Sequence, residues 1–146
     1  MLKEKLMEDL KSAMKEKDEI RKNTVTMIKA AILQIEKDKQ IQLTEDQILE
    51  IIAKEAKKRK DALVEFEKSG REDLVNQTKK ELEIIKAYLP AELSREELEK
   101  IVVDVIQEVG AVDMKDMGKV MQAVKAKTTG RADGKIINEI VKSKLS

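Results

Sequence analysis

The side chains of this chain that could do chemistry are carboxylates, lysines and arginines, because the sequence contains no cysteine and no histidine. Without cysteine there is no disulfide, no thiolate nucleophile and no cysteine metal site. Without histidine, the chain lacks the commonest general base near neutral pH and a frequent metal ligand. We therefore predict no catalytic residue, no cofactor and no metal site.

Four charged residues fall on the apolar faces of predicted helices, and they are Arg21, Glu55, Arg59 and Glu81. Glu55 and Arg59 are four residues apart, so they can pair on one helix face. A polar pocket would bring such charges together, and so would an ion-pair network that fixes the register of the helices. We favour the structural polar network, because buried charges in proteins usually occur in pairs.

A second candidate is the compact loop "TTGRADGK" near the end of the chain. Its glycines and basic residues could cradle a phosphate at a helix N-terminus. However, Gly130 suits the end of one helix and Asp133 suits the N-cap of the next, so capping alone accounts for the loop. Arg131 has no capping role, and we expect it to reach outward.

Basic residues outnumber acidic ones in the last quarter of the chain, where residues 113–146 carry eight basic and four acidic side chains. On two predicted helices of this segment, lysines lie opposite the apolar stripe, and a helical hairpin would place them on both sides of Arg131. The candidate RNA-binding residues are Lys115, Lys119, Arg131, Lys135 and Lys142. An ordinary solvated face is the alternative. Both aromatic residues lie on inward stripes, so we expect recognition of a folded or duplex RNA rather than stacking on single strands.

The elements that position these residues are predicted to be helices, and the fold class all-α and multihelical. Capping boxes predict helix starts at Thr44 and Ser94, each preceded by a leucine in the staple position. The first of these helices should run to about Ser69, before Gly70. The only proline, Pro90, must end another helix.

These signals divide the chain at Pro90. We predict an N-terminal helical subdomain of about four helices over residues 1–90 and a C-terminal three-helix subdomain over residues 91–146. The three C-terminal helices are expected at residues 95–109, 114–127 and 134–145. Neither a signal peptide nor a membrane-spanning stretch is recognisable, so we expect a cytoplasmic protein with no membrane partner. Because the formal net charge is only +1, a charged partner must be recognised by a local patch.

Two stretches, "YLPAELSREEL" and "GKVMQAVKAKTTGRADGKIINEIVKSKL", resemble the signature sequences of the GatB/YqeY family. The chain is similar in length to the stand-alone, bacterial-type YqeY-like members. Its C-terminal half is also similar to the helical tail domain of GatB, a subunit of the glutamine-dependent amidotransferase that converts misacylated Glu-tRNA or Asp-tRNA to the amide form. The resemblance implies an all-helical fold of two subdomains and points the basic face toward tRNA. The tail motif falls on Gly118, Lys119, Val120, Met121, Gly130, Arg131, Ala132, Asp133 and Lys135.

Two functions follow as hypotheses. The first is a non-catalytic tRNA-binding or RNA-binding adaptor, which would work with a tRNA-amidotransferase or synthetase component. The alternative is an amidotransferase accessory that acts only with a partner, a carbon–nitrogen ligase activity with glutamine as amido-N-donor. It rests on the family resemblance and on the cluster of Glu55, Arg59 and Glu81. A protein-interaction module that uses the acidic face of residues 95–108 is a third reading.

Overall fold

The computed structural model describes residues 1–146 and contains seven α-helices, one short 3-10 helix and no strand. The prediction of an all-α, multihelical fold is therefore confirmed. The chain separates into two compact units, Met1–Pro90 and Ala91–Ser146, and each unit has its own apolar core. No helix is both long enough and apolar enough to cross a bilayer.

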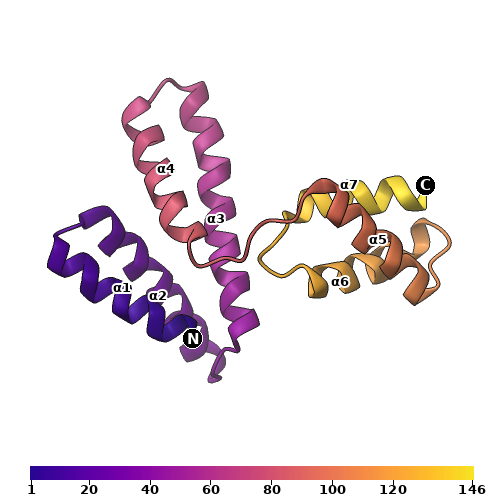
Figure 1. Ribbon diagram of the computed structural model, residues 1–146, viewed down its shortest axis with the longest axis horizontal. Helices are drawn as coiled ribbons and strands as arrows, with labels where there is room; N and C mark the ends of the chain where they lie inside the picture. Colours follow the sequence, from indigo (N-terminus) through magenta and orange to yellow (C-terminus); the bar gives the residue numbers. More distant parts are fainter. The chain divides into compact units, whose positions relative to one another are not determined.

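Unit 1 contains two helical hairpins (Figure 1). The first joins α1 (Leu2–Glu16) to α2 (Glu19–Lys39), and the second joins α3 (Glu45–Lys68) to α4 (Glu72–Lys86). The capping box at Thr44 is present, because its side chain accepts from the Gln47 N–H and the Gln47 side chain accepts from the Thr44 N–H. The buried core of the unit is formed by Leu6, Val25, Ile28, Ile32, Ile48, Ile52, Ala56, Leu82, Ile85 and Tyr88.

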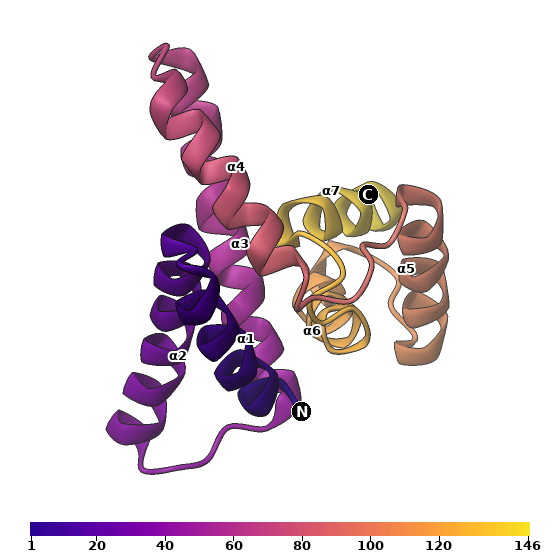
Figure 2. The ribbon, with the colours of Figure 1, turned by 60° about the vertical axis from the view of Figure 1, so that its left-hand side comes forward.

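The α3–α4 hairpin extends past the ends of α1 and α2, and Figure 2 shows this most clearly. On α3 the buried core residues end at Ala56, although the helix continues to Lys68. Gly70, at the turn, adopts a φ of 72°, the left-handed conformation that favours glycine. Toward Gly70, α3 and α4 therefore pack only against each other.

Tyr88 follows the end of α4 and belongs to the buried core of unit 1. Its side chain is buried, its hydroxyl donates to the Asp9 carboxylate of α1, and the Lys5 ammonium lies 5.3 Å from the centre of its ring. The Asp9 carboxylate also pairs with Arg21 of α2 at 3.3 Å. Burial, then the hydrogen bond to Asp9 and the negative charge of that carboxylate, raise the pKa of the Tyr88 hydroxyl well above its usual value. This cluster ties three helices together.

Unit 2 is a three-helix bundle of α5 (Arg95–Val109), α6 (Met117–Lys127) and α7 (Gly134–Leu145). Its apolar core is formed by Leu98, Val102, Val105, Val120, Val124, Ile137, Ile140, Val141 and Leu145. The helix expected from Met114 begins instead as a 3-10 turn, η1 (Met114–Asp116). The Asp113 side chain accepts from the Lys115 N–H, and this local cap favours the tighter turn before α6 begins.

Candidate nucleic-acid interface

In the α6–α7 hairpin (Figure 1), three contacts identify which edge of each helix faces a neighbouring helix. The Lys125 Cε lies 4.0 Å from the position that a Cβ on Gly134 would occupy, so this edge of α6 faces α7. Lys127 pairs with Glu108 of α5 at 2.9 Å, so the other edge of α6 faces α5. Arg95 of α5 similarly lies 4.0 Å from Glu139, which marks the edge of α7 that faces α5.

Helical spacing then places further residues on the shared outer surface of α6 and α7. Gln122 and Gly118 precede Lys125 by three and seven positions, so they share its edge. On α7, Lys135, Asn138 and Lys142 follow one another at spacings of three and four, and Glu139 adjoins them, four residues after Lys135 and three before Lys142. Because the helices are antiparallel, Lys125 and Lys135 lie near the connecting loop and Lys142 lies toward the opposite end of the hairpin.

Five lysines of this surface are exposed, and none of their ammonium groups has a hydrogen bond or an ion pair. We call them the α6–α7 lysines: Lys115, Lys119, Lys125, Lys135 and Lys142. Lys119 lies farther from α7 than Lys125 does, and Lys115 lies in the η1 turn. On the α5 side, by contrast, Lys127 and Glu139 each have a partner of opposite charge. The five lysine ammonium groups on the outer surface of α6 and α7 thus have no carboxylate within ion-pair distance.

Lys125 was missed as a candidate by the sequence reasoning, which considered only lysines directly opposite the apolar stripe. Its spacing of three from Gln122 was the available signal. The direction in which α7 packs could not be read from that spacing, because a helix in a three-helix bundle has two possible neighbouring edges. The other candidates, Lys115, Lys119, Lys135 and Lys142, are exposed as expected, and their role in binding RNA stays a prediction.

Arg131 differs from the expectation that it reaches outward. Its side chain is half-buried, and its Nε–H donates to the Ala91 carbonyl at 3.1 Å. In return, the Leu93 N–H donates to the Arg131 carbonyl at 2.8 Å. Arg131 therefore fastens the first residues of unit 2 to the α6–α7 loop, and the guanidinium is turned toward the backbone.

The rest of the loop serves the two helix ends. Asp133 accepts from the Lys135 N–H at 2.9 Å and so caps α7, and Gly130 adopts a φ of 74° after α6. The carboxylate of Asp133 occupies the helix N-terminus where a phosphate would have to sit. The loop is built for capping, as the sequence suggested.

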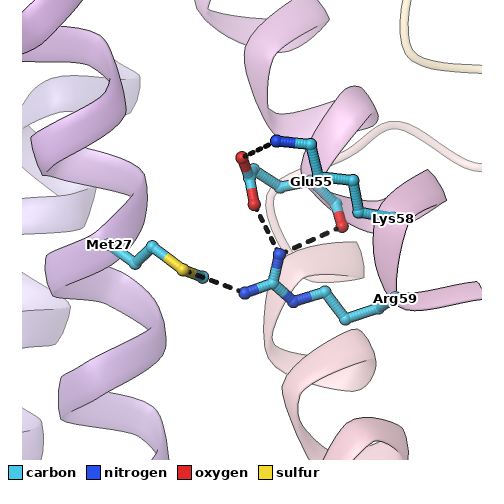
Figure 3. Close-up of polar contacts among 4 residues, drawn as sticks. All are labelled: Met27, Glu55, Lys58 and Arg59. Atoms are coloured by element: carbon cyan, nitrogen blue, oxygen red, sulfur yellow. Dashed lines mark hydrogen bonds and ion pairs between the residues drawn. The ribbon is translucent and has the colours of Figure 1, made fainter. Parts of the chain in front are cut away.

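The charged residues expected on inward faces divide into two groups. On α3, Glu55 is buried and forms an ion pair with Arg59, while Lys58 contacts its other oxygen at 3.3 Å (Figure 3). The second terminal nitrogen of Arg59 lies 3.1 Å from the Met27 sulfur of α2. Glu81 of α4 is half-buried and makes no ion pair.

Arg21 belongs elsewhere, in the cluster around Tyr88. It pairs with Asp9 at 3.3 Å and with Glu16 at 3.5 Å, both on α1. The four residues therefore do not form one network. The sequence showed that each lies beside apolar neighbours, but which helices meet at each position is a long-range property of the packing.

No group of three or more aspartate and glutamate side chains is arranged to hold a metal ion. Seven helices in two units, with no cysteine or histidine, define a small all-α protein in which basic side chains outnumber acidic ones over residues 113–146. The chain belongs to the YqeY-like protein family, which matches residues 3–145.

Three relatives, all named "Altered inheritance of mitochondria protein 41, mitochondrial", are similar to this chain. The protein from Kluyveromyces lactis is 39% identical over 105 residues, which cover 69% of this chain and 56% of the relative. The protein from Vanderwaltozyma polyspora is 33% identical over 120 residues, 77% of this chain and 64% of the relative. The protein from Pyrenophora tritici-repentis is 29% identical over 146 residues, 96% of this chain and 81% of the relative.

The chain thus spans less than two thirds of the length of the first two relatives. Their names also correct one expectation. We expected a cytoplasmic protein from the absence of a recognisable signal, but the relatives are named as mitochondrial proteins and point to the mitochondrion instead.

Proposed function

We propose that this protein is a non-catalytic RNA-binding adaptor that holds a folded RNA, such as a tRNA, against the α6–α7 lysines. One observation carries the proposal: these five ammonium groups are exposed and unpaired, whereas Lys127 on the α5 side is paired with Glu108. Unpaired lysines on one surface are suited to bind the phosphates of a nucleic acid. Such contacts give affinity and position the protein, but they do not read the sequence. The similarity of this segment to the tail of GatB supports tRNA as the RNA.

Folded RNA fits this surface better than a single strand does. Phe66 and Tyr88 are the only aromatic residues, and both belong to unit 1, so unit 2 offers no ring on which a base could stack. Recognition would depend on the spacing of phosphates in a helix. Because the relatives are named mitochondrial, we take the mitochondrion as the compartment in which the RNA is met.

The test is a titration of fluorescently labelled tRNA with the full chain at two salt concentrations. If about four phosphates are engaged, the affinity should fall about a hundredfold for a fourfold rise in salt. The double variant Lys125→Glu, Lys135→Glu should bind at least about tenfold more weakly at low salt, and the slope of log affinity against log salt should fall by about two.

The matched control is Lys11→Glu, Lys37→Glu, which changes the net charge equally in exposed, unpaired lysines of unit 1. It should bind nearly as the unaltered protein does. Equal weakening by the two double variants would show that only net charge matters and would remove the α6–α7 lysines as a site. Tighter binding of poly(U) than of tRNA would contradict recognition of folded RNA.

The amidotransferase accessory function is not favoured. Its structural motive was the cluster of Glu55, Arg59 and Glu81, but the Arg59 guanidinium is paired with the Glu55 carboxylate, and no base is positioned to activate a nucleophile there. Two carboxylates and a guanidinium without a positioned nucleophile do not make a site for acyl or amide transfer.

A further inference from the structure

A cavity of about 270 Å³ lies on the α3–α4 hairpin of unit 1, and the α6–α7 surface has no part in it. It is lined by Lys58, Arg59, Ala62, Phe66, Thr78 and Glu81. A volume of this size equals that of about nine liquid waters, so it suits a molecule of about ten non-hydrogen atoms. It lies just below the usual range for sites of drug-sized ligands.

Thr78 is the group in this cavity that most needs a partner. Its residue is 6% exposed, and its hydroxyl makes no hydrogen bond to the protein. No fully buried side-chain polar atom of the chain lacks a partner, so the Thr78 hydroxyl keeps some exposure, and Thr78 lines the cavity. Buried polar groups are normally paired, and a hydroxyl left open in this way is available to a ligand.

Glu81, three residues farther along α4, adds an acceptor beside Thr78. Its carboxylate is half-buried and has no hydrogen bond or ion pair. A carboxylate in such a position is suited to a ligand ammonium group, because a charge-assisted hydrogen bond is about twice as strong as a neutral one.

The cationic side of the cavity is supplied by Lys58 and Arg59. Both contact the carboxylate of Glu55, and Figure 3 shows the two side chains on either side of it. Glu55 and the Met27 sulfur hold the terminal nitrogens of Arg59 in place, yet each cation keeps N–H groups that are not used. The guanidinium is thus pre-positioned for a second, external carboxylate.

The charges of the four ionisable groups, Lys58, Arg59, Glu55 and Glu81, sum to zero, and Phe66 and Ala62 provide an apolar wall. We propose that this cavity binds a free α-amino acid. Its carboxylate lies at Lys58 and Arg59, its ammonium group at Glu81 with Thr78 beside it, and its side chain against Phe66. A ligand with a single charge would bind either the Glu81 carboxylate or the unused N–H groups of Lys58 and Arg59, but not both.

The experiment records amide NMR spectra of the full chain with L-leucine, L-glutamine or glycine at about 10 mM. That concentration is about ten times the millimolar Kd expected for so small a ligand in a partly open cavity. Isoamylamine and isocaproate share the carbon skeleton of leucine but lack its carboxylate and its amine, respectively. We expect at least one amino acid to shift the amides of Phe66, Thr78 and Glu81, with both single-charge analogues at least about tenfold weaker.

The variant Glu81→Gln gives a result that a merely structural role would not produce. It should weaken leucine about tenfold and strengthen isocaproate, because the cavity then carries a net positive charge. Glu83→Gln, on the exposed side of α4, is the matched control and should change neither. Thr78→Ser should retain binding and Thr78→Val should weaken it.

Two results would overturn the proposal. One is the absence of shifts at these amides with all three amino acids. The other is an affinity for leucine that isoamylamine or isocaproate matches, or that is unchanged in Glu81→Gln. Either finding would show that the cavity does not recognise the ammonium and carboxylate groups of the ligand together. Circular dichroism of each variant establishes that it is folded, and the RNA titration is independent of the outcome.

Discussion

Replacement of Arg131 separates its role in the fold from a role in RNA binding. In the structure, Arg131 fastens residues 91–93 to the α6–α7 loop through one side-chain and one backbone hydrogen bond. Arg131→Ala removes the hydrogen bond from its charged Nε–H to the Ala91 carbonyl and the packing of its aliphatic stem. The Leu93–Arg131 backbone hydrogen bond stays possible in the variant.

The magnitude follows from the half-burial of the side chain. A hydrogen bond to a charged group contributes about 1.5 to 3 kcal/mol when water is excluded, and partial exposure lowers this to about 1 to 2 kcal/mol. In a unit of this size, each kcal/mol shifts the melting temperature by about 4 to 8 °C. Thermal unfolding of the full chain, followed by circular dichroism, should therefore show unit 2 melting at least about 4 °C lower. The Leu93 peak in amide NMR spectra should move as well.

Arg131→Lys retains the charge and most of the stem but lacks the Nε–H. Its melting temperature should lie between those of the unaltered protein and of Arg131→Ala, and it should bind tRNA as the unaltered protein does. Arg131→Ala should weaken tRNA binding less than Lys135→Ala does, because the guanidinium is already committed to the Ala91 carbonyl. The reasoning fails if Arg131→Ala melts normally and loses tRNA affinity, since the arginine would then point outward in solution.

Two further changes have effects that can be worked from the structure. Tyr88→Phe should destabilise unit 1 by about 1 kcal/mol in urea denaturation, because the hydrogen bond to Asp9 is lost. The folded-state pKa of Tyr88 is raised, so its contribution is fully present below pH ~10 and is lost as the pH rises further; a constant difference from Tyr88→Phe up to pH ~11 would contradict this. Thr44→Ala should cost about 1 kcal/mol and Thr44→Ser almost nothing, and equal urea midpoints for the two would refute the role of the capping box.

The helices could be predicted because their ends are written in local sequence. The side chain at Ser94 accepts from the Glu97 N–H at 3.1 Å, so the predicted helix start is confirmed, although the Glu97 carboxylate accepts from the Ser94 hydroxyl rather than from its N–H as a capping box requires. Gly70 follows the end of α3, as the pattern indicated. Such signals involve residues three or four apart and do not depend on the rest of the fold. The 3-10 turn at Met114 escaped prediction because Asp113 competes locally with the regular start of a helix.

The candidate sites were less predictable, since they depend on which helix edges meet. The periodicity placed Arg21 beside apolar residues but could not reveal that Asp9, on another helix, is its partner. It assigned Arg131 to the surface because no local cap used it, whereas its acceptor lies 40 residues earlier in the chain. Glu55 and Arg59 were easier, because residues four apart on one helix meet without any help from the fold.

The projecting α3–α4 hairpin gives unit 1 an uneven resistance to local opening. Between Ala56 on α3 and Thr78 on α4, no residue is fully buried, so few apolar contacts oppose separation of the two helices there. We expect local opening of the two helices to start at Gly70 and to stop at the buried residues. Amide hydrogen exchange should therefore be fastest near Gly70 and become slower toward Ala56 and Thr78. Phe66 lies within this stretch and Thr78 at its boundary. A ligand that contacts both residues should therefore slow amide hydrogen exchange near Gly70 and leave exchange in the buried core unchanged.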